Sequence, residues 1–79
     1  MFIMKDRDIR LLELGNKIKL ERTKRNMSQE ELAERAEVSI RTVSDIERGI
    51  TDIRYTNLMQ IAQAFDLSLY EMLNYKYFV

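Results

Sequence analysis

Two helix-start signals stand only eleven residues apart in the stretch "SQEELAERAEVSIRTVSDIERG", which runs from Ser28 to Gly49. Ser28 can cap one helix and Ser39 a second, because a serine hydroxyl accepts a hydrogen bond from the free N–H groups of a helix's first turn. Neither glycine nor proline lies between the two serines to mark a longer loop. Helices expected at about residues 29–36 and 40–48 must therefore cross steeply. The spacing predicts a helix-turn-helix at about residues 28–48.

The rest of the chain shows the same preference for helices. Ser68 and Glu71 in "LSLYEM" repeat the capping box that Ser28 and Glu31 form in "MSQEEL". Apolar periodicity predicts two more helices, at about residues 8–26 and 56–65. The 79 residues contain no proline and only two glycines, which favours continuous helices over strands and turns. We therefore expect an all-α fold in one domain spanning residues 1–79.

Several classes of chemistry are disfavoured by composition. The chain contains neither cysteine nor histidine, so the soft metal ligands and the common nucleophile and base pairings are missing. No pair of carboxylates is clustered on one predicted face. We expect no enzyme activity, no metal and no cofactor. The opening "MFIM" is too short for a signal peptide, and no later segment is long enough to cross a membrane, so we expect a cytoplasmic protein without a membrane partner.

Charge is unevenly distributed although the formal net charge is zero. Residues 1–26 carry eight Lys and Arg against four Asp and Glu, whereas residues 27–48 carry three against six. A local basic stripe is what contacts to DNA phosphates require. A solvated helix face is the alternative interpretation of such a charge run.

The predicted crossing assigns an inner and an outer face to the helix at residues 40–48. Val43 and Ile46 face the apolar side of the preceding helix, where Ala33 is small enough for a close approach. The outer stripe of the later helix then consists of Arg41, Ser44, Asp45 and Arg48. This stripe is the surface that DNA would meet.

Three motifs occur in order in the chain: "SQEELAERA", then "IERG", then "LMQIAQAFDLSLYEML". With them, residues 14–73 resemble the Cro/C1-type (XRE-like) helix-turn-helix family of phage repressors and restriction-modification controller proteins. The resemblance implies a compact five-helix lambda-repressor-like domain with short extensions at both ends. It also implies double-stranded DNA bound against the third helix, usually a homodimer, and a bacterial or phage protein acting on the nucleoid.

Residues that match the family's DNA contacts follow from this resemblance. Gln29 matches a glutamine that anchors a phosphate and braces the third helix. Arg41 is the strongest candidate for a base contact, because a guanidinium can bond guanine O6 and N7 together, and Ile40 could touch a thymine methyl. Asp45 could accept from cytosine N4 or steer Arg41 from one turn away. The full predicted set is Lys24, Ser28, Gln29, Ser39, Ile40, Arg41, Thr42, Ser44, Asp45, Arg54 and Thr56.

Within that set, Arg54 and Thr56 match the loop and helix start where the family meets a phosphate, which positions the protein without reading sequence. Arg22 and Glu47 match a structural pair that joins the first helix to the end of the third. Removing one partner could cost about 3 to 5 kcal/mol if the other stays buried and unpaired.

Two departures from the family pattern matter. Glu37 occupies the turn position that often holds glycine, so a left-handed backbone there would carry about 1 kcal/mol of strain. The tail "NYKYFV" adds apolar residues beyond the family core, where one small domain has little interior left for them. We therefore predict a dimer interface made of Leu69, Met72, Leu73, Tyr75, Tyr77 and Phe78.

The sequence is interpreted as a sequence-specific DNA-binding transcriptional regulator, a repressor that binds a palindromic operator as a homodimer. The alternative is an antitoxin-type interaction protein, which binds a toxin and represses its own promoter as a by-product.

Overall fold

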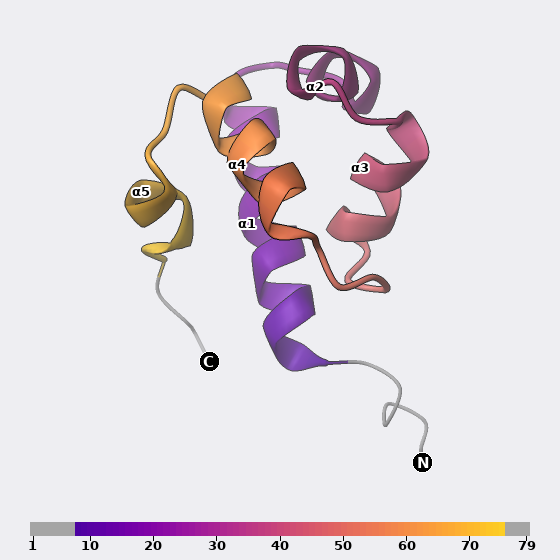
Figure 1. Cartoon of the computed structure of the whole chain (residues 1–79), viewed down its shortest axis with the longest axis vertical. Coiled ribbons are helices and arrows are strands. Elements are labelled where there is room, and N and C mark those ends of the chain that lie inside the picture. The colour runs from indigo at the N-terminus through magenta and orange to yellow at the C-terminus, as the bar shows by residue number, and fades with distance from the viewer. Residues whose placement is uncertain (1–7, 76–79) are drawn as a thin grey trace.

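The computed structural model describes residues 8–75, which form five α-helices and no strand (Figure 1). The helices are α1 (Ile9–Lys24), α2 (Gln29–Ala36), α3 (Ile40–Glu47), α4 (Tyr55–Ala64) and α5 (Leu69–Leu73). The all-α prediction is confirmed, and each predicted helix lies within two residues of its observed bounds. The predicted interface residues Tyr77 and Phe78 lie outside the described residues. None of the helices in residues 8–75 is long and apolar enough to cross a membrane.

Serine caps start three of the helices as predicted. The N–H of Glu31 donates to Ser28 Oγ at 3.0 Å while the N–H of Ser28 donates to the Glu31 carboxylate at 2.8 Å, which completes the capping box of α2. Ser68 and Glu71 build the same box at α5. At α3 the N–H of Thr42 donates to Ser39 Oγ at 3.0 Å.

The turn between α2 and α3 is held in a left-handed conformation at Glu37, with φ 61° and ψ 41°. The N–H groups of Glu37 and Val38 donate to the carbonyls of Glu34 and Ala33, so the last carbonyls of α2 are satisfied within the turn. A non-glycine residue is thus tolerated at this position, at the cost of about 1 kcal/mol expected for a left-handed residue with a Cβ. The turn needs only three residues, which gives the steep crossing.

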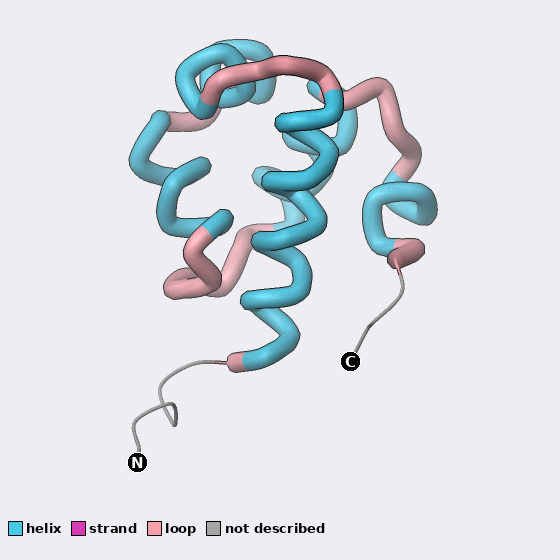
Figure 2. Tube along the Cα trace, turned by 180° about the vertical axis from the view of Figure 1, so that it is seen from behind, coloured by secondary structure: helices cyan, strands magenta, loops and turns pink. Residues whose placement is uncertain are grey.

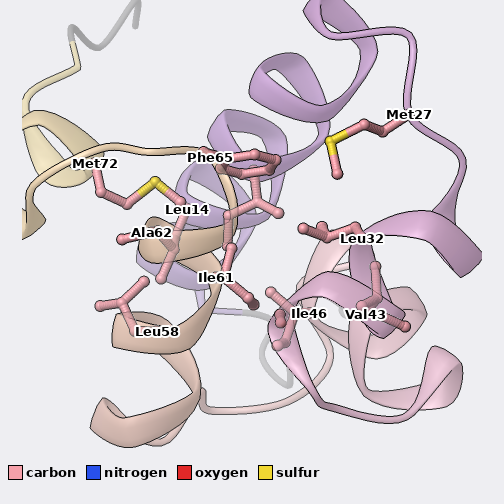
Figure 3. Close-up of a cluster of buried hydrophobic side chains, with 13 residues drawn as sticks. Leu14, Met27, Leu32, Val43, Ile46, Leu58, Ile61, Ala62, Phe65 and Met72 are labelled. Atoms are coloured by element: carbon pink, nitrogen blue, oxygen red, sulfur yellow. The ribbon is translucent and has the colours of Figure 1, made fainter.

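One apolar core holds the helices together (Figure 3). Ile18, Leu32, Val43, Ile61 and Met72 are fully buried in it, one from each helix. The other buried apolar side chains are Leu14, Met27, Ala33, Ala36, Ile46, Leu58, Ala62 and Phe65. The predicted inner faces of α2 and α3 therefore form the contact between them.

The two faces of the molecule are separated by α1 and α4. In both views α3 lies on one side of α1 and α4 and α5 lies on the other, with α2 at the top end of the molecule (Figures 1 and 2). A surface on α3 and a surface on α5 consequently face different surroundings.

Candidate nucleic-acid interface

The outer face of α3 carries exposed basic side chains. The Arg41 side chain is 87% exposed and that of Arg48 is 61% exposed, whereas Asp45 between them is 26% exposed. Ile40 at the start of the helix is also exposed, and Ser44 is half-buried. The structure places the predicted outer stripe at the surface, and it adds Arg48, which the predicted DNA-binding set omits.

Asp45 joins the two arginines of this face. Its Oδ1 accepts a hydrogen bond from Arg48 Nη2 at 2.9 Å, and its Oδ2 lies 3.8 Å from Arg41 Nε. The spacings of three and four residues place all three groups on one side of α3. The sequence interpretation weighed a link from Asp45 to Arg41, but the shorter contact is the one to Arg48.

Serine and threonine hydroxyls of the predicted set are engaged in the caps. Ser28 Oγ accepts from the Glu31 N–H, and Ser39 Oγ accepts from the Thr42 N–H while also sharing a 2.8 Å hydrogen bond with Thr42 Oγ1. A hydroxyl oxygen can accept a second bond, so these groups remain exposed polar surface at the starts of α2 and α3. In the structure their observed role is to define where the two helices begin.

A buried ion pair braces α3 from behind. Arg22 Nε donates to Glu47 Oε2 at 2.7 Å and Arg22 Nη2 donates to Oε1 at 3.0 Å, a two-pronged contact between α1 and the end of α3. Gln29 Nε2 donates to the same Oε1 at 3.0 Å, and Arg22 Nη1 donates to the carbonyl of Met27 at 2.8 Å. The hydrogen bond to Glu47 raises the pKa of Arg22 above its ordinary value. Arg22 of α1 and Gln29 of α2 are thereby tied to one carboxylate at the end of α3, and the Glu47 side chain is only 3% exposed.

Gly15 lets α1 approach the same end of α3. A Cβ added to Gly15 would meet the carbonyl oxygens of Ile46 and Glu47, the latter at 2.8 Å. No side chain larger than hydrogen fits without moving one helix. Sequence reasoning missed this role, and the available signal was a glycine inside an otherwise helical pattern.

Most basic side chains of α1 form ion pairs with acidic side chains of the same domain. Glu21, which is buried, is bound by Lys17 at 2.6 Å, by Arg25 at 2.7 Å and by Lys24 at 3.3 Å. Burial alone would raise the pKa of Glu21, but hydrogen bonds from these three cations outweigh it and lower the pKa to about 2. The predicted basic stripe of the first helix is therefore much weaker than the sequence count suggests.

Arg25 extends this cluster to α4. Its guanidinium lies over the ring of Phe65, with 4.9 Å between the guanidinium carbon and the ring centre, and its Nη2 donates to the carbonyl of Phe65 at 3.0 Å. Lys24 keeps an exposed side chain at 57% and is the cation of the group best able to reach a ligand.

A polar hollow adjoins α3 at the start of α4. It is lined by Thr42, Asp45, Ile46, Thr51, Asp52, Ile53, Arg54 and Asn57. Arg54 is the N-cap residue of α4 but makes no side-chain cap, whereas the other four helices in residues 8–75 each have a capping Asp or Ser. The first-turn N–H groups of α4 thus lie without a side-chain acceptor beside exposed Arg54 and Thr56.

An apolar hollow lies on the opposite side of the molecule, on α5. Leu69, Tyr70, Leu73 and Asn74 line it, with Tyr70 75% exposed and Leu73 44% exposed. Met72, which was included in the predicted interface, points into the chain's own core and is fully buried. It presents no surface to a partner, because neighbouring residues of a helix point about 100° apart, so Met72 faces the core while Leu73 faces solvent. Tyr75 is half-buried.

Comparison with known proteins agrees with this architecture. The model of the Helix-turn-helix family HTH_3 matches residues 18–72. No curated protein matches the chain significantly.

Several solved structures are similar. The restriction-modification controller protein C.AhdI from Aeromonas hydrophila is 27% identical with a TM-score of 0.81, and the match covers 84% of this chain and 100% of that one. The biofilm regulator SinR in complex with DNA is 32% identical with a TM-score of 0.71, covering 77% of this chain and 98% of that one. The gene regulator ClgR from Corynebacterium glutamicum is 27% identical with a TM-score of 0.75, covering 80% and 67%. With the family model spanning most of its length, the chain belongs to the Cro/C1-type (XRE) helix-turn-helix family of DNA-binding transcriptional regulators.

Proposed function

We propose that this protein is a sequence-specific repressor that binds a palindromic operator as a homodimer, and that it acts by occupying the operator. The proposal rests on how α3 is held in the fold and on which of its side chains are exposed. Its outer face presents Arg41 and Arg48 to solvent, while Glu47 at its inner end is held by Arg22 and Gln29. A helix that is held at its inner end and exposes two arginines on its outer face suits the major groove, which admits one α-helix.

Base reading is assigned to the first turns of α3. The Arg41 guanidinium can bond guanine O6 and N7 together, and Ile40 can contact a thymine methyl. Ser39, Thr42 and Ser44 flank these side chains. Their observed positions at the start and outer side of α3 support the assignment.

Phosphate contacts are assigned to the edges of the same surface. Gln29 stands at the start of α2, where a helix N-terminus favours an anion, and its amide already contacts Glu47. Arg54 and Thr56 stand at the uncapped start of α4, next to the polar hollow. Lys24 supplies a further exposed cation. Such contacts position the protein on the duplex, whereas base contacts specify the site.

The homodimer is assigned to α5. Tyr70 and Leu73 form an exposed apolar surface there, and aromatic side chains are favoured where subunits meet. Because α5 and α3 lie on different sides of the α1 and α4 pair, pairing through α5 leaves α3 free (Figure 1). Two recognition helices of a dimer fit palindromic half-sites when they are about 34 Å apart, one turn of DNA.

Selection of bound DNA from fragments of the source genome tests the proposal. The purified protein is expected to enrich an inverted repeat whose half-site centres are about 10 base pairs apart. The Arg41→Ala variant, selected in parallel, is expected to lose that enrichment. Equal recovery of all fragments by the wild-type protein would contradict sequence-specific binding.

An interaction protein of antitoxin type is the second candidate, because the apolar hollow on α5 would also suit a different protein. In a solved structure of a complex between the SinR and SinI proteins, the matching chain is 32% identical to this protein, and the match covers 77% of this chain. A relative therefore binds a protein partner. A stoichiometric complex with the product of an adjacent gene, lost in a Leu73→Glu variant, would favour this function. The homodimer assignment for α5 would then be wrong.

A further inference from the structure

Asp45 is a negative charge on the surface that the proposed function places against DNA. Phosphates repel a carboxylate, so an acidic side chain at this position opposes binding unless it has a compensating role. Its neighbours on the same face are the exposed Arg41 and Arg48. The geometry of these three side chains indicates what the role is.

The carboxylate of Asp45 is less exposed to solvent than the guanidinium groups of Arg41 and Arg48. Asp45 is 26% exposed against 87% for Arg41 and 61% for Arg48, and it also lines the polar hollow that includes Arg54. Arg48 is bound directly, through Nη2 at 2.9 Å. Arg41 is approached through Nε, which lies 3.8 Å from Oδ2 and thus too far away for a hydrogen bond, so Asp45 does not hold the Arg41 guanidinium as it holds that of Arg48.

This arrangement distinguishes two modes of DNA binding. Without a matching sequence, a protein is held almost entirely by Lys and Arg contacts to phosphates. A phosphate that binds Arg48 Nη2 displaces Asp45, and the carboxylate is then unpaired next to the phosphates. On a matching sequence, the terminal nitrogens of Arg41 can bond a guanine while its Nε still faces Asp45. The repulsion therefore weakens binding mainly to DNA that lacks the matching sequence, which is a recognised route to specificity.

We propose that Asp45 is a specificity-determining residue, which raises the preference for operator over other double-stranded DNA by penalising arginine contacts to phosphates outside the operator. The inference rests on the proposed function and deepens it. It assigns to Asp45 a role in rejecting DNA that lacks the operator sequence, whereas the sequence interpretation offered it a contact to cytosine or the steering of Arg41.

The test compares Asp45→Asn with Asp66→Asn on two DNAs. Both variants remove one carboxylate with little change in shape. Asp66 is exposed in the loop after α4, with φ 62°, a conformation that asparagine tolerates, and at the opposite end of α4 from Arg54. An operator duplex obtained by selection with the wild-type protein and a scrambled duplex of equal length are titrated at several salt concentrations. Thermal unfolding of each variant, followed by circular dichroism, checks that the fold is kept.

For Asp45→Asn, affinity for the scrambled duplex is expected to rise about threefold or more, whereas affinity for the operator rises less, so their ratio falls. On scrambled DNA, the slope of log affinity against log salt concentration should steepen by the amount expected for about one phosphate contact, because Arg48 becomes free to contact the backbone. Asp66→Asn should shift both affinities by one small common factor.

Three results would overturn the inference. If Asp45→Asn raised both affinities equally, as the control does, the residue would act only through net charge. If neither affinity changed, Asp45 would lie outside the interface. If operator affinity alone fell, Asp45 would be an ordinary base contact. In each case the wild-type protein still prefers the operator, so the proposed function stands, and loss of that wild-type preference would remove both.

Discussion

Arg41 and Lys24 are both exposed cations, yet the structure holds them differently. Arg41 extends from the outer face of α3, with its side chain 87% exposed and its Nε 3.8 Å from Asp45 Oδ2. Lys24, at the end of α1, is 3.3 Å from the buried Glu21 and has one flexible ammonium to offer. A planar guanidinium can read a base pair, whereas an ammonium acts as a point charge toward a phosphate.

Replacing Arg41 by Ala is expected to weaken operator binding by about 1 to 3 kcal/mol and to relax the preference at one base pair in each half-site. Arg41→Lys is the matched control, because it keeps the charge but loses the two-pronged bond. It should retain affinity for random DNA while losing the base preference. Titration of operator and random duplexes measures both effects. Equal losses on the two DNAs would assign Arg41 to the backbone.

Lys24→Ala provides the contrast within the same experiment. It should weaken binding to operator and random DNA alike. It should also reduce the slope of log affinity against log salt concentration by the amount expected for about one phosphate contact. An unchanged salt dependence would place Lys24 outside the interface.

At the level of helices, the pose of α3 depends on how closely α1 can approach it. Arg22 reaches Glu47 only because the two helices are near each other, and Gly15 on the same helix supplies the space against the carbonyls of Ile46 and Glu47. Gly49, with φ 72°, then turns the chain away beside Leu12. The backbone contact and the ion pair together set the direction in which Arg41 is presented.

Gly15→Ala is expected to destabilise the fold by about 1 to 3 kcal/mol, although alanine is the better helix former, because its Cβ would overlap the end of α3. Urea unfolding measures this change. The neighbouring Asn16→Ala, at an exposed position of the same helix, should be neutral or stabilising. A Gly15→Ala protein as stable as the wild type would show that α1 and α3 can separate without loss.

Over the whole molecule, the exposed arginines around α3 and the apolar hollow of α5 lie on different sides of α1 and α4 (Figure 1). Arg41, Arg48 and Arg54 are exposed around α3 and the start of α4, whereas Tyr70 and Leu73 are exposed on α5. In the proposed homodimer, this separation leaves α3 free for DNA while α5 contacts the second copy of the chain.

Leu73→Glu is expected to shift the protein from dimer toward monomer at micromolar concentration, because it places a charge in the apolar hollow of α5. Leu20→Glu is the matched control, since Leu20 is an exposed leucine on α1 at 55%. Sedimentation velocity distinguishes the two, and operator binding should weaken in the first variant alone. An unchanged dimer would place the interface elsewhere.

Acid should unfold the protein partly through Glu21. Its pKa is lowered from an ordinary 4.5 to about 2 in the folded state, so its contribution is complete above pH 4.5 and is lost as the pH falls from 4.5 toward 2. The full contribution is at most about 3 kcal/mol by that shift. Urea unfolding at a series of pH values measures this contribution. Between pH 4.5 and 2, the free energy of unfolding should fall less for Glu21→Gln than for the wild-type protein.

Glu34→Gln removes an exposed carboxylate from α2 and serves as the control for that experiment. It should keep the acid dependence of the wild-type protein. If Glu21→Gln also kept it, the three cations around Glu21 would contribute nothing to acid sensitivity.

The sequence by itself determined where the helices begin and which faces they bury. Ser28, Ser39 and Ser68 act on N–H groups within three residues of themselves, so these signals need no tertiary context. Apolar spacing likewise fixed the inner faces of α2 and α3, and the resemblance of the motifs led to the family.

Only the tertiary structure decided which charges remain available. Lys17, Lys24 and Arg25 looked like a basic stripe, but the fold buries Glu21 among them, and Phe65, forty residues after Arg25 in the chain, holds Arg25 from the end of α4. The same holds for Gly15, whose role arises from two helices meeting, and for Met72, which packs into the core while Leu73 faces outward. Contacts between distant segments have no local signal, because they form only when the whole chain has folded.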